Sequence, residues 1–252
     1  MRTLVGLGYS GWTEKARWAL DHHRLPYQYR EHIPLVGELR LRLHAPRGQR
    51  GTVPLLLEDS GATMGSYAIA QRAEREGKGA PLFPAASLPE IEQWEQLSDA
   101  ILRVGRAYMV QRLMQFPEAQ AESLPPFIPG FARGRLTPMA RMAASFLATK
   151  HAAAPEPEAA LLATVVPGLE RLRAALQGGR FLIGTFSYAD IAMALTLQSI
   201  QPVDELFIPL GPGRRQAWTH PALAERFADL IRWRDQLYTE RRPAPVDPKA
   251  KP

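Results

Sequence analysis

The stretch "LGYSGWTEKARWAL" (Leu7–Leu20) connects the end of a short apolar run to a patterned helix. The apolar run, "TLVGLG" (Thr3–Gly8), is bounded by glycine and is typical of a buried strand. From Thr13 onward, apolar residues recur on one side of a helix. Ser10 is therefore expected at the start of that helix, where two roles are open to its hydroxyl group.

The first role is to bind an anion. A helix N-terminus carries unpaired N–H groups and about half a positive charge, so an anion is favoured there and a serine hydroxyl can donate a hydrogen bond to it. If the anion is a thiolate, lowering the thiol pKa by about two units requires about 2.7 kcal/mol of preferential binding. One charge-assisted hydrogen bond and a helix terminus supply about that much. The second role is to cap the helix, and the stretch alone favours the cap because serine is among the preferred N-cap residues.

The chain has no cysteine among its 252 residues. This excludes disulfides, thiolate zinc sites, iron–sulfur clusters and a cysteine nucleophile, so any thiol chemistry must come from a bound molecule. The six histidines show no pair at the helical i, i+4 spacing, so we expect no metal site.

Charge and hydropathy set further limits. The 31 basic residues exceed the 25 acidic ones, but they are scattered along the chain, so nucleic-acid binding is not expected. The first residues lack the apolar core of a signal peptide, and no stretch approaches a membrane span. We therefore expect a cytoplasmic protein that does not bind a membrane.

Strand and helix patterns alternate in the N-terminal third of the chain. Strands are predicted at residues 3–8 and 27–33, with a helix between them from Thr13 to His22. The stretch "TVPLLLEDSGATMG" predicts a hairpin with its turn at Asp59–Gly61, and a helix follows from Ser66 to near Gly77. The predicted order is strand, helix, strand, a link, strand, strand, helix.

The proline-bearing connector "APLFPAASLPE" (Ala80–Glu90) indicates a domain boundary. After it, no segment is convincing as a strand. Helix patterns follow at residues 90–115, from about Met139, and at 158–177 with a bend at Pro167, and a proline-rich insert occupies 117–138. The predicted domains are residues 1–79, a linker at 80–89, an all-helical domain at 90–240 and a disordered tail at 241–252.

Two more stretches suggest binding chemistry. In "GTVPLLL" (Gly51–Leu57), proline just inside a strand is unexpected, because proline cannot donate to the strand ladder. A cis Val53–Pro54 bond would turn the backbone of Val53 outward to pair with an extended peptide; the alternative is a trans proline on an edge strand. In "MGSYAIAQRAE" (Met64–Glu74), Ser66 is predicted as an N-cap whose following N–H groups suit a carboxylate, and the alternative is a simple cap.

Together, these stretches predict a thiolate site, a backbone clip for a peptide and a carboxylate site on one strand–helix unit. A small peptide with a thiol in its middle and a carboxylate at its end fits that combination. Glutathione has this description.

At this point the sequence resembles the cytosolic glutathione transferase family. The segment "SGWTEKAR" (Ser10–Arg17) is similar to the S-[PG]-[FW]-S-x-K-[VA]-R opening of serine-type members, including bacterial ones. "GTVP" matches the segment before the third strand, whose proline is cis in the family, and "FLIGTFSYADIAMA" (Phe181–Ala194) resembles a C-terminal family segment. The resemblance implies a thioredoxin-like N-terminal domain (β-α-β-α-β-β-α) followed by an all-helical C-terminal domain, and a homodimer.

The resemblance also implies roles for individual residues. Ser10 would hydrogen-bond the glutathione thiolate, with Tyr9 as a rival and Thr13 as a third candidate. The glutathione backbone and carboxylates would be held by Val53, Pro54, Gly65, Ser66, Thr52 and Arg50, with Arg47 as an alternative to Arg50. Two of these depart from the family pattern: Gly65 replaces an acidic residue, and Thr52 stands where Lys or Gln often meets the glycyl carboxylate.

The electrophilic substrate is expected between the two domains, against the helix at residues 90–115. The candidate pocket residues are Trp12, Arg106, Tyr108, Met109, Arg112 and Met114, although methionines of a helix are at least as often ordinary core. Asp99 is a candidate to reach the site of a partner subunit. An exposed helix acid is more often simply solvated.

The sequence is consistent with two functions. The first is a glutathione S-transferase of detoxification type, which activates the glutathione thiolate for attack on a small electrophile. The second is a non-catalytic binding protein on the same scaffold, holding an apolar ligand or a partner chain. Gly65 and the insert at 117–138 motivate the second.

Overall fold

A computed structural model of the chain describes residues 2–34, 37–46, 48–124, 138, 141–142, 145–146 and 156–243. Three predicted features lie outside the described residues: Arg47, the insert residues 125–137 and the tail residues 244–252. Of the helix expected from about Met139, only residues 141–142 and 145–146 are described. No helix in the described ranges has both the length and the hydrophobicity that crossing a bilayer requires.

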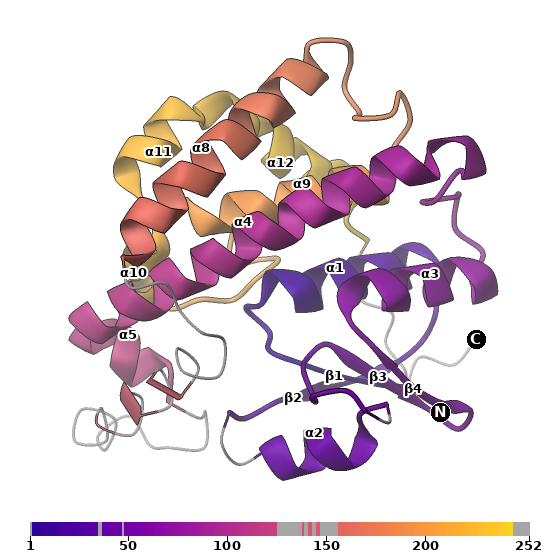
Figure 1. Cartoon of the computed structure of the whole chain (residues 1–252), viewed down its shortest axis with the longest axis horizontal. Coiled ribbons are helices and arrows are strands. Elements are labelled where there is room, and N and C mark those ends of the chain that lie inside the picture. The colour runs from indigo at the N-terminus through magenta and orange to yellow at the C-terminus, as the bar shows by residue number, and fades with distance from the viewer. Residues whose placement is uncertain are drawn as a thin grey trace. The chain divides into compact units, whose positions relative to one another are not determined.

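The N-terminal part has a thioredoxin-like βαβαββα order (Figure 1). Its elements are β1 (Thr3–Gly6), α1 (Gly11–His22), β2 (Gln28–Glu31), α2 (Glu38–His44), β3 (Leu55–Glu58), β4 (Gly61–Met64) and α3 (Ser66–Glu76). The sheet order is β2-β1-β3-β4, with β1 parallel to β2 and β3 antiparallel to both of its neighbours. The predicted fold of this part is confirmed, and α2 lies in the link, where the residue pattern predicted no element but the family resemblance implied a helix.

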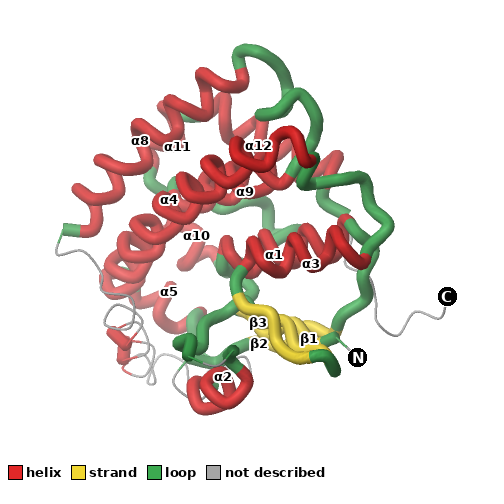
Figure 2. The backbone as a smooth tube through the Cα atoms, turned by 45° about the vertical axis from the view of Figure 1, so that its right-hand side comes forward, coloured by secondary structure: helices red, strands yellow, loops and turns green. Residues whose placement is uncertain are grey.

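Helices cover both faces of this sheet. Helices α1 and α3 lie on one face and α2 lies on the other (Figure 2). On the α2 face, Val5 and Leu55 form a buried cluster with Leu41. Side chains alternate along a strand, so Leu4 and Leu56, both fully buried, face α1 and α3.

The predicted hairpin is present. Glu58 pairs with Gly61, which leaves Asp59 and Ser60 as the two turn residues. Leu55 and Leu56 of β3 are buried, and three of the four residues of β4 are partly buried, so the hairpin is packed along its length rather than held by the turn alone.

The remaining described elements are helical, so the chain has the architecture of a thioredoxin-like domain followed by a helical domain. They are η1 (Ala85–Ser87), α4 (Leu88–Gln115), α5 (Pro117–Glu122), α8 (Pro157–Leu176), α9 (Tyr188–Thr196), η3 (Leu197–Ser199), α10 (Pro212–Trp218), α11 (Pro221–Arg226) and α12 (Ala228–Arg241), where η marks a 3₁₀ helix. Helix α4 matches the pattern predicted at 90–115, and α8 contains Pro167 as expected. The first residues of the predicted insert form α5.

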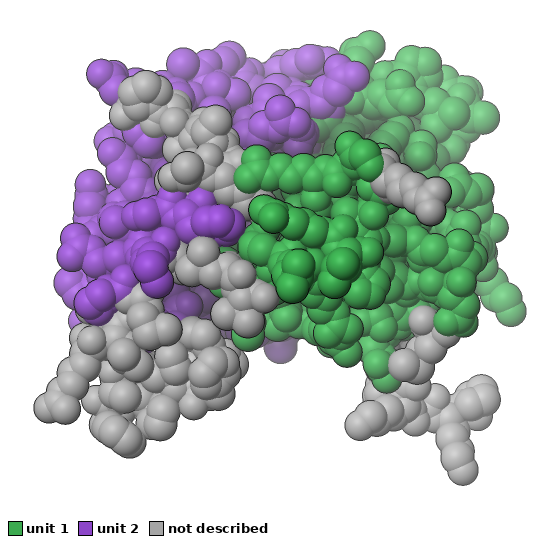
Figure 3. All heavy atoms as spheres, turned by 60° about the horizontal axis from the view of Figure 1, so that its bottom comes forward, with its two compact units in different colours: residues 1–95, 179–195, 236–252 green, residues 96–178, 196–235 purple. Residues whose placement is uncertain are grey.

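The described chain divides into two compact units (Figure 3). Unit 1 comprises residues 1–95, 179–195 and 236–252, and unit 2 comprises 96–178 and 196–235. The segment expected to be a disordered tail begins with Arg241, which is the last residue of α12, and Arg242, whose side chain is 4% exposed. These first two residues of the expected tail therefore belong to the folded part of unit 1.

Candidate functional site

Three segments singled out in the sequence meet at one end of the sheet. Val5 pairs with Leu55, so the next residues, Gly6 and Pro54, follow at the same end of β1 and β3. The N–H of Gly65 donates to the carbonyl of Pro54 at 3.0 Å, which ties the start of α3 to the residues before β3. The turn after β1, the Val53–Pro54 segment and the start of α3 are thus neighbours.

Ser10 occupies the N-cap position of α1. Its backbone is extended (φ −78°, ψ 127°), its N–H donates to the carbonyl of Leu7 at 2.9 Å, and its carbonyl accepts from Glu14 at 2.9 Å. The side chain makes no capping hydrogen bond, so the capping role favoured by the stretch alone is wrong. The half-buried hydroxyl is therefore not engaged by the first N–H groups of the helix.

Thr13 is fully buried behind the same turn. Its Oγ1 accepts a hydrogen bond from the N–H of Leu7 at 3.2 Å. Gly6 packs so closely on it that a Cβ at Gly6 would lie 2.4 Å from Thr13 Cγ2. Thr13 supports the turn from inside the protein, whereas Tyr9 and Ser10 are partly exposed.

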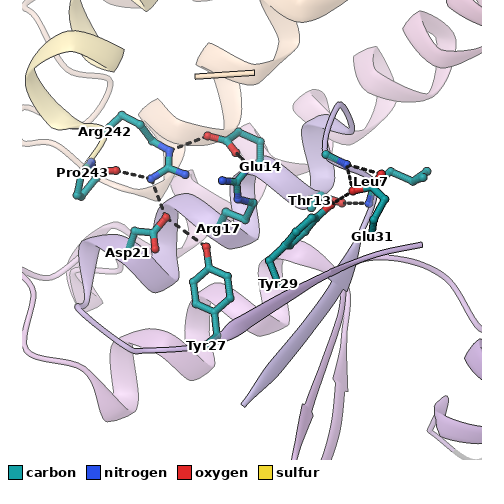
Figure 4. A network of polar contacts seen from close by, with 11 residues as sticks. Leu7, Thr13, Glu14, Arg17, Asp21, Tyr27, Tyr29, Glu31, Arg242 and Pro243 are labelled. Atoms are coloured by element: carbon teal, nitrogen blue, oxygen red, sulfur yellow. Dashed lines mark hydrogen bonds and ion pairs between the residues drawn. The ribbon is translucent and has the colours of Figure 1, made fainter. Parts of the chain in front are cut away.

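Glu31 holds the turn from the other side, and the sequence analysis missed it (Figure 4). Its two carboxylate oxygens lie 3.1 and 3.2 Å from the backbone nitrogen of Gly8. The hydroxyl of Tyr29 donates to Glu31 Oε2 at 2.6 Å. The strand alternation of residues 27–33 places Tyr29 and Glu31 on one face, but nothing local indicates that this face reaches the turn after β1.

The Val53–Pro54 peptide bond is cis, as the unusual proline position suggested. Within the described residues, neither the N–H nor the C=O of Val53 has a hydrogen-bond partner. The N–H of Thr52 lies 3.3 Å from Met64 Sδ, so the residue before Val53 is turned toward β4. Both backbone groups of Val53 are free to pair with an extended ligand.

The start of α3 differs from the prediction by one residue. Gly65 holds the N-cap position, with φ +93°, and its carbonyl accepts from Ile69 at 3.0 Å. Ser66 is the first residue of the helix and is 3% exposed. A left-handed φ favours glycine over any residue with a side chain, and a Cβ at Gly65 would meet nothing within 4 Å. Open space therefore lies beside Gly65, at the N-terminus of a helix whose first N–H groups lack helical acceptors.

Residues 4–81 match the family described as "Glutathione S-transferase, N-terminal domain". This part of the chain is therefore similar to glutathione S-transferase N-terminal domains. No protein in the comparison with curated sequences matches the chain.

Solved structures share the fold over almost the whole chain. A glutathione S-transferase from Methylobacterium radiotolerans, in complex with glutathione sulfonate, is 21% identical, with a TM-score of 0.59 over 100% of this chain and 96% of that one. A glutathione S-transferase from Methylobacillus flagellatus with glutathione bound is 16% identical, with a TM-score of 0.56 over 97% and 100%. FzlA from C. crescentus is 19% identical, with a TM-score of 0.56 over 99% of each chain. At these identities the likeness establishes the fold.

Helix α1 carries buried charges along its length (Figure 4). Arg242 Nε donates to Glu14 Oε1 at 2.6 Å, and Arg242 Nη1 donates to Asp21 Oδ2 at 2.8 Å. Both carboxylate side chains are fully buried. Burial raises the pKa of Asp21, and the charge and hydrogen bonds of Arg242 act against that shift.

A second buried pair joins Lys15 Nζ to Glu95 Oε2 at 2.7 Å. The Lys15 side chain is fully buried, so its charge is compensated by this contact rather than by solvent. Lys15 therefore belongs to the interior of unit 1 and not to the exposed turn.

The predicted electrophile-binding residues of α4 lie in unit 2, whereas Trp12 lies in unit 1. Tyr108 is 4% exposed, and its ring centroid lies 5.7 Å from that of His220. Arg112 Nε donates to the carbonyl of Ala217 at 3.3 Å, which ties α4 to α10. Both side chains are used in packing.

Other predicted residues on α4 are partly buried. Burial, with the charge of Arg103 adding to it, lowers the pKa of Arg106 to about 10, while Asp99 acts in the opposite direction. Met109 and Met114 are also partly buried. Asp99 forms an ion pair with Arg103 one turn along the helix.

Among the remaining predicted glutathione contacts, Thr52 is half-buried and Arg50 is exposed. Over the ranges that the structure describes, no group of three or more His, Asp or Glu side chains is arranged to hold a metal ion.

Proposed function

We propose that this chain is a glutathione S-transferase that stabilises the glutathione thiolate for attack on an electrophilic carbon. One observation carries the proposal: the Ser10 hydroxyl stands at the N-terminus of α1 without a capping bond. It does so in a domain of the glutathione S-transferase family, at the sheet end that also bears Val53 and the start of α3.

Glutathione would be bound as a short added strand. The free N–H and C=O of Val53, presented by the cis bond to Pro54, would pair with the cysteinyl backbone. The first N–H groups of α3, with Ser66, would bind the γ-glutamyl carboxylate. Gly65 offers no side chain, so binding there rests on backbone donors. Thr52 and Arg50 are the candidates for the glycyl carboxylate.

The chemistry needs only a charged sulfur. The thiol releases its proton to solvent, and the Ser10 hydroxyl donates a hydrogen bond to the resulting thiolate. The thiolate then forms a bond to the electrophilic carbon as the leaving group departs with its electron pair. About 2.7 kcal/mol of thiolate stabilisation would lower the thiol pKa by about two units, from about 8.5 to near neutral pH.

Several finer points belong to the same proposal. Tyr9 and Thr13 remain alternative hydroxyl donors, and Thr13 is the weaker because its oxygen already accepts from Leu7. The electrophile would bind near Trp12, Arg106, Tyr108, Met109 and Arg112. A homodimer, a cytoplasmic location, a detoxification role, and domain limits at 1–79, 80–89, 90–240 and 241–252 are expected with this function.

A second candidate is a non-catalytic binding protein on this scaffold. The observation that favours it is Gly65, which leaves the γ-glutamyl subsite without the acidic side chain common in the family. Such a protein would hold an apolar ligand or a partner chain and bind glutathione weakly.

Affinity and activity separate the two candidates. We expect the unaltered chain to be retained on immobilised glutathione and to conjugate glutathione to 1-chloro-2,4-dinitrobenzene. Ser10→Ala should lose about 10- to 100-fold in rate, equal to about 1.4–2.7 kcal/mol, because the thiolate loses its hydrogen bond. Tyr9→Phe is the matched control at the adjacent hydroxyl. A chain that neither binds nor conjugates glutathione favours the second candidate, and an unchanged rate in Ser10→Ala overturns the assignment of Ser10.

A further inference from the structure

The turn between β1 and α1 is held by side chains at two successive N–H groups. Leu7 donates to Thr13 Oγ1 at 3.2 Å, and Gly8 donates to the Glu31 carboxylate at 3.1 and 3.2 Å. The N–H of Ser10 closes the turn onto the carbonyl of Leu7 at 2.9 Å. Three hydrogen bonds in four residues therefore determine where the Ser10 side chain stands.

Glu31 reaches the turn from β2, an edge strand of the sheet. The Tyr29 hydroxyl, two residues earlier on the same face, donates to Glu31 at 2.6 Å and orients the carboxylate (Figure 4). The Arg17 guanidinium lies 5.4 Å from the centroid of the Tyr29 ring and supports it from α1. Burial together with the hydrogen bond to Glu31 raises the pKa of Tyr29, so its hydroxyl remains a donor at every working pH.

The charge of Glu31 is the wrong sign for stabilising a thiolate directly. A carboxylate near a thiolate disfavours the ionised sulfur, so an electrostatic role would raise the thiol pKa. Its contact with Gly8 instead fixes the position of the turn that carries Ser10. A site that must place a donor within hydrogen-bond distance of sulfur loses much of its effect when the donor moves by about 1 Å.

We propose that Glu31 is a positioning residue: its carboxylate, oriented by Tyr29, holds the N–H of Gly8 and thereby places the Ser10 hydroxyl against the glutathione sulfur. This inference rests on the proposed function. It assigns a role to a residue of β2 that is not among the proposed glutathione contacts and that acts only through the turn.

The thiol pKa of bound glutathione tests this inference. It is measured from thiolate absorbance in the full chain, alongside kcat for 1-chloro-2,4-dinitrobenzene. Glu31→Ala releases the turn, so the thiol pKa should rise by about one unit and kcat should fall about fivefold near pH 6.5. Glu31→Gln keeps an oxygen for the Gly8 N–H and should stay within about twofold of the unaltered chain. Arg30→Ala, on the opposite face of β2, is the matched control and should also stay within about twofold.

A double mutant separates positioning from a general loss of stability. In the Ser10→Ala background, Glu31→Ala should change kcat by less than about twofold, since no hydroxyl remains to be placed. A fall in thiol pKa in Glu31→Ala would indicate a direct charge effect and overturn the proposal. Equal losses in Glu31→Ala and Glu31→Gln, or lower unfolding stability with unchanged kcat and thiol pKa, would also overturn it. If the unaltered chain conjugates no glutathione, the proposed function itself fails. If Glu31→Ala has the same kcat as an active unaltered chain, only the role of Glu31 fails.

Discussion

The hydroxyl groups of Ser10 and Thr13, three residues apart, have different roles because they differ in burial. Thr13 is fully buried and accepts from a backbone N–H, whereas Ser10 is half-buried and caps nothing. Sequence spacing alone left Tyr9, Ser10 and Thr13 as rival donors. The hydrogen bond from Leu7 to Thr13 makes Thr13 the weaker candidate, because its oxygen already accepts a backbone N–H.

The two hydroxyls should differ in what they contribute to stability. Thr13→Val keeps the shape but leaves the partly buried Leu7 N–H without its acceptor, so it should lower the free energy of unfolding by about 1–3 kcal/mol. Ser10→Ala removes no capping bond and should change it by less than about 0.5 kcal/mol. Urea unfolding of both variants measures this. A larger loss in Ser10→Ala than in Thr13→Val would contradict the assigned roles.

His23 is a second residue whose behaviour depends on burial. It is 1% exposed, its Nε2 lies 3.5 Å from Glu74, and burial together with the charge of His22 lowers its pKa from 6.5 to about 4. Between these values the unfolded chain binds the proton more readily than the folded one. The stability contributed by the neutral ring is complete above about pH 6.5 and is lost as the pH falls toward 4.

Replacing His23 should therefore weaken the acid sensitivity of the protein. Between pH 7 and pH 4, the free energy of unfolding of His23→Leu should rise relative to the unaltered chain by about 2–3 kcal/mol. Urea unfolding at a series of pH values gives this difference. His44→Leu, at an exposed position, controls for the loss of an imidazole as such. A difference that does not vary with pH, or that falls toward pH 4, would show that His23 is not desolvated as described.

At the scale of elements, α1 is held at both ends by charges from distant segments. Its first turns carry Glu14, its last turn carries Asp21, and Arg242, just beyond α12, bonds to both. The helix pattern of residues 13–22 correctly indicated the element. It also contained charged residues that a pattern of this kind places on the solvated face, yet these carboxylates are fully buried.

Removing the guanidinium should be costly for that reason. Arg242→Leu removes the hydrogen-bonded cation of the buried Asp21 and leaves Glu14 with Arg17 at 3.4 Å, so it should lower the free energy of unfolding by about 3–5 kcal/mol. The exposed ion pair of Arg180 with Glu240 provides the control, and Arg180→Ala should cost less than about 1 kcal/mol. Denaturant unfolding of both variants measures the contrast. Similar small losses in both would mean that the contacts of Arg242 contribute little.

For the whole molecule, fold and activity are separate conclusions. The family match covers residues 4–81, and the solved structures share the fold along almost the full chain at low identity. Fold alone does not define chemistry, because one scaffold supports several functions. The proposed activity therefore rests on the sheet end where the segments of Ser10, Val53 and Ser66 are neighbours.

The sequence by itself determined most elements of the N-terminal part, their order and the three segments of the candidate site, and it left the Val53–Pro54 bond open between cis and trans. These depend on local features: apolar periodicity, turn residues, and a proline where a strand needs a donor. Only the tertiary structure decided that Ser10 is free of capping, that Gly65 rather than Ser66 precedes α3, and that Glu31 and Arg242 contact the N-terminal turn and helix. Such contacts join residues far apart along the chain, and burial determines their strength, so no local pattern contains them.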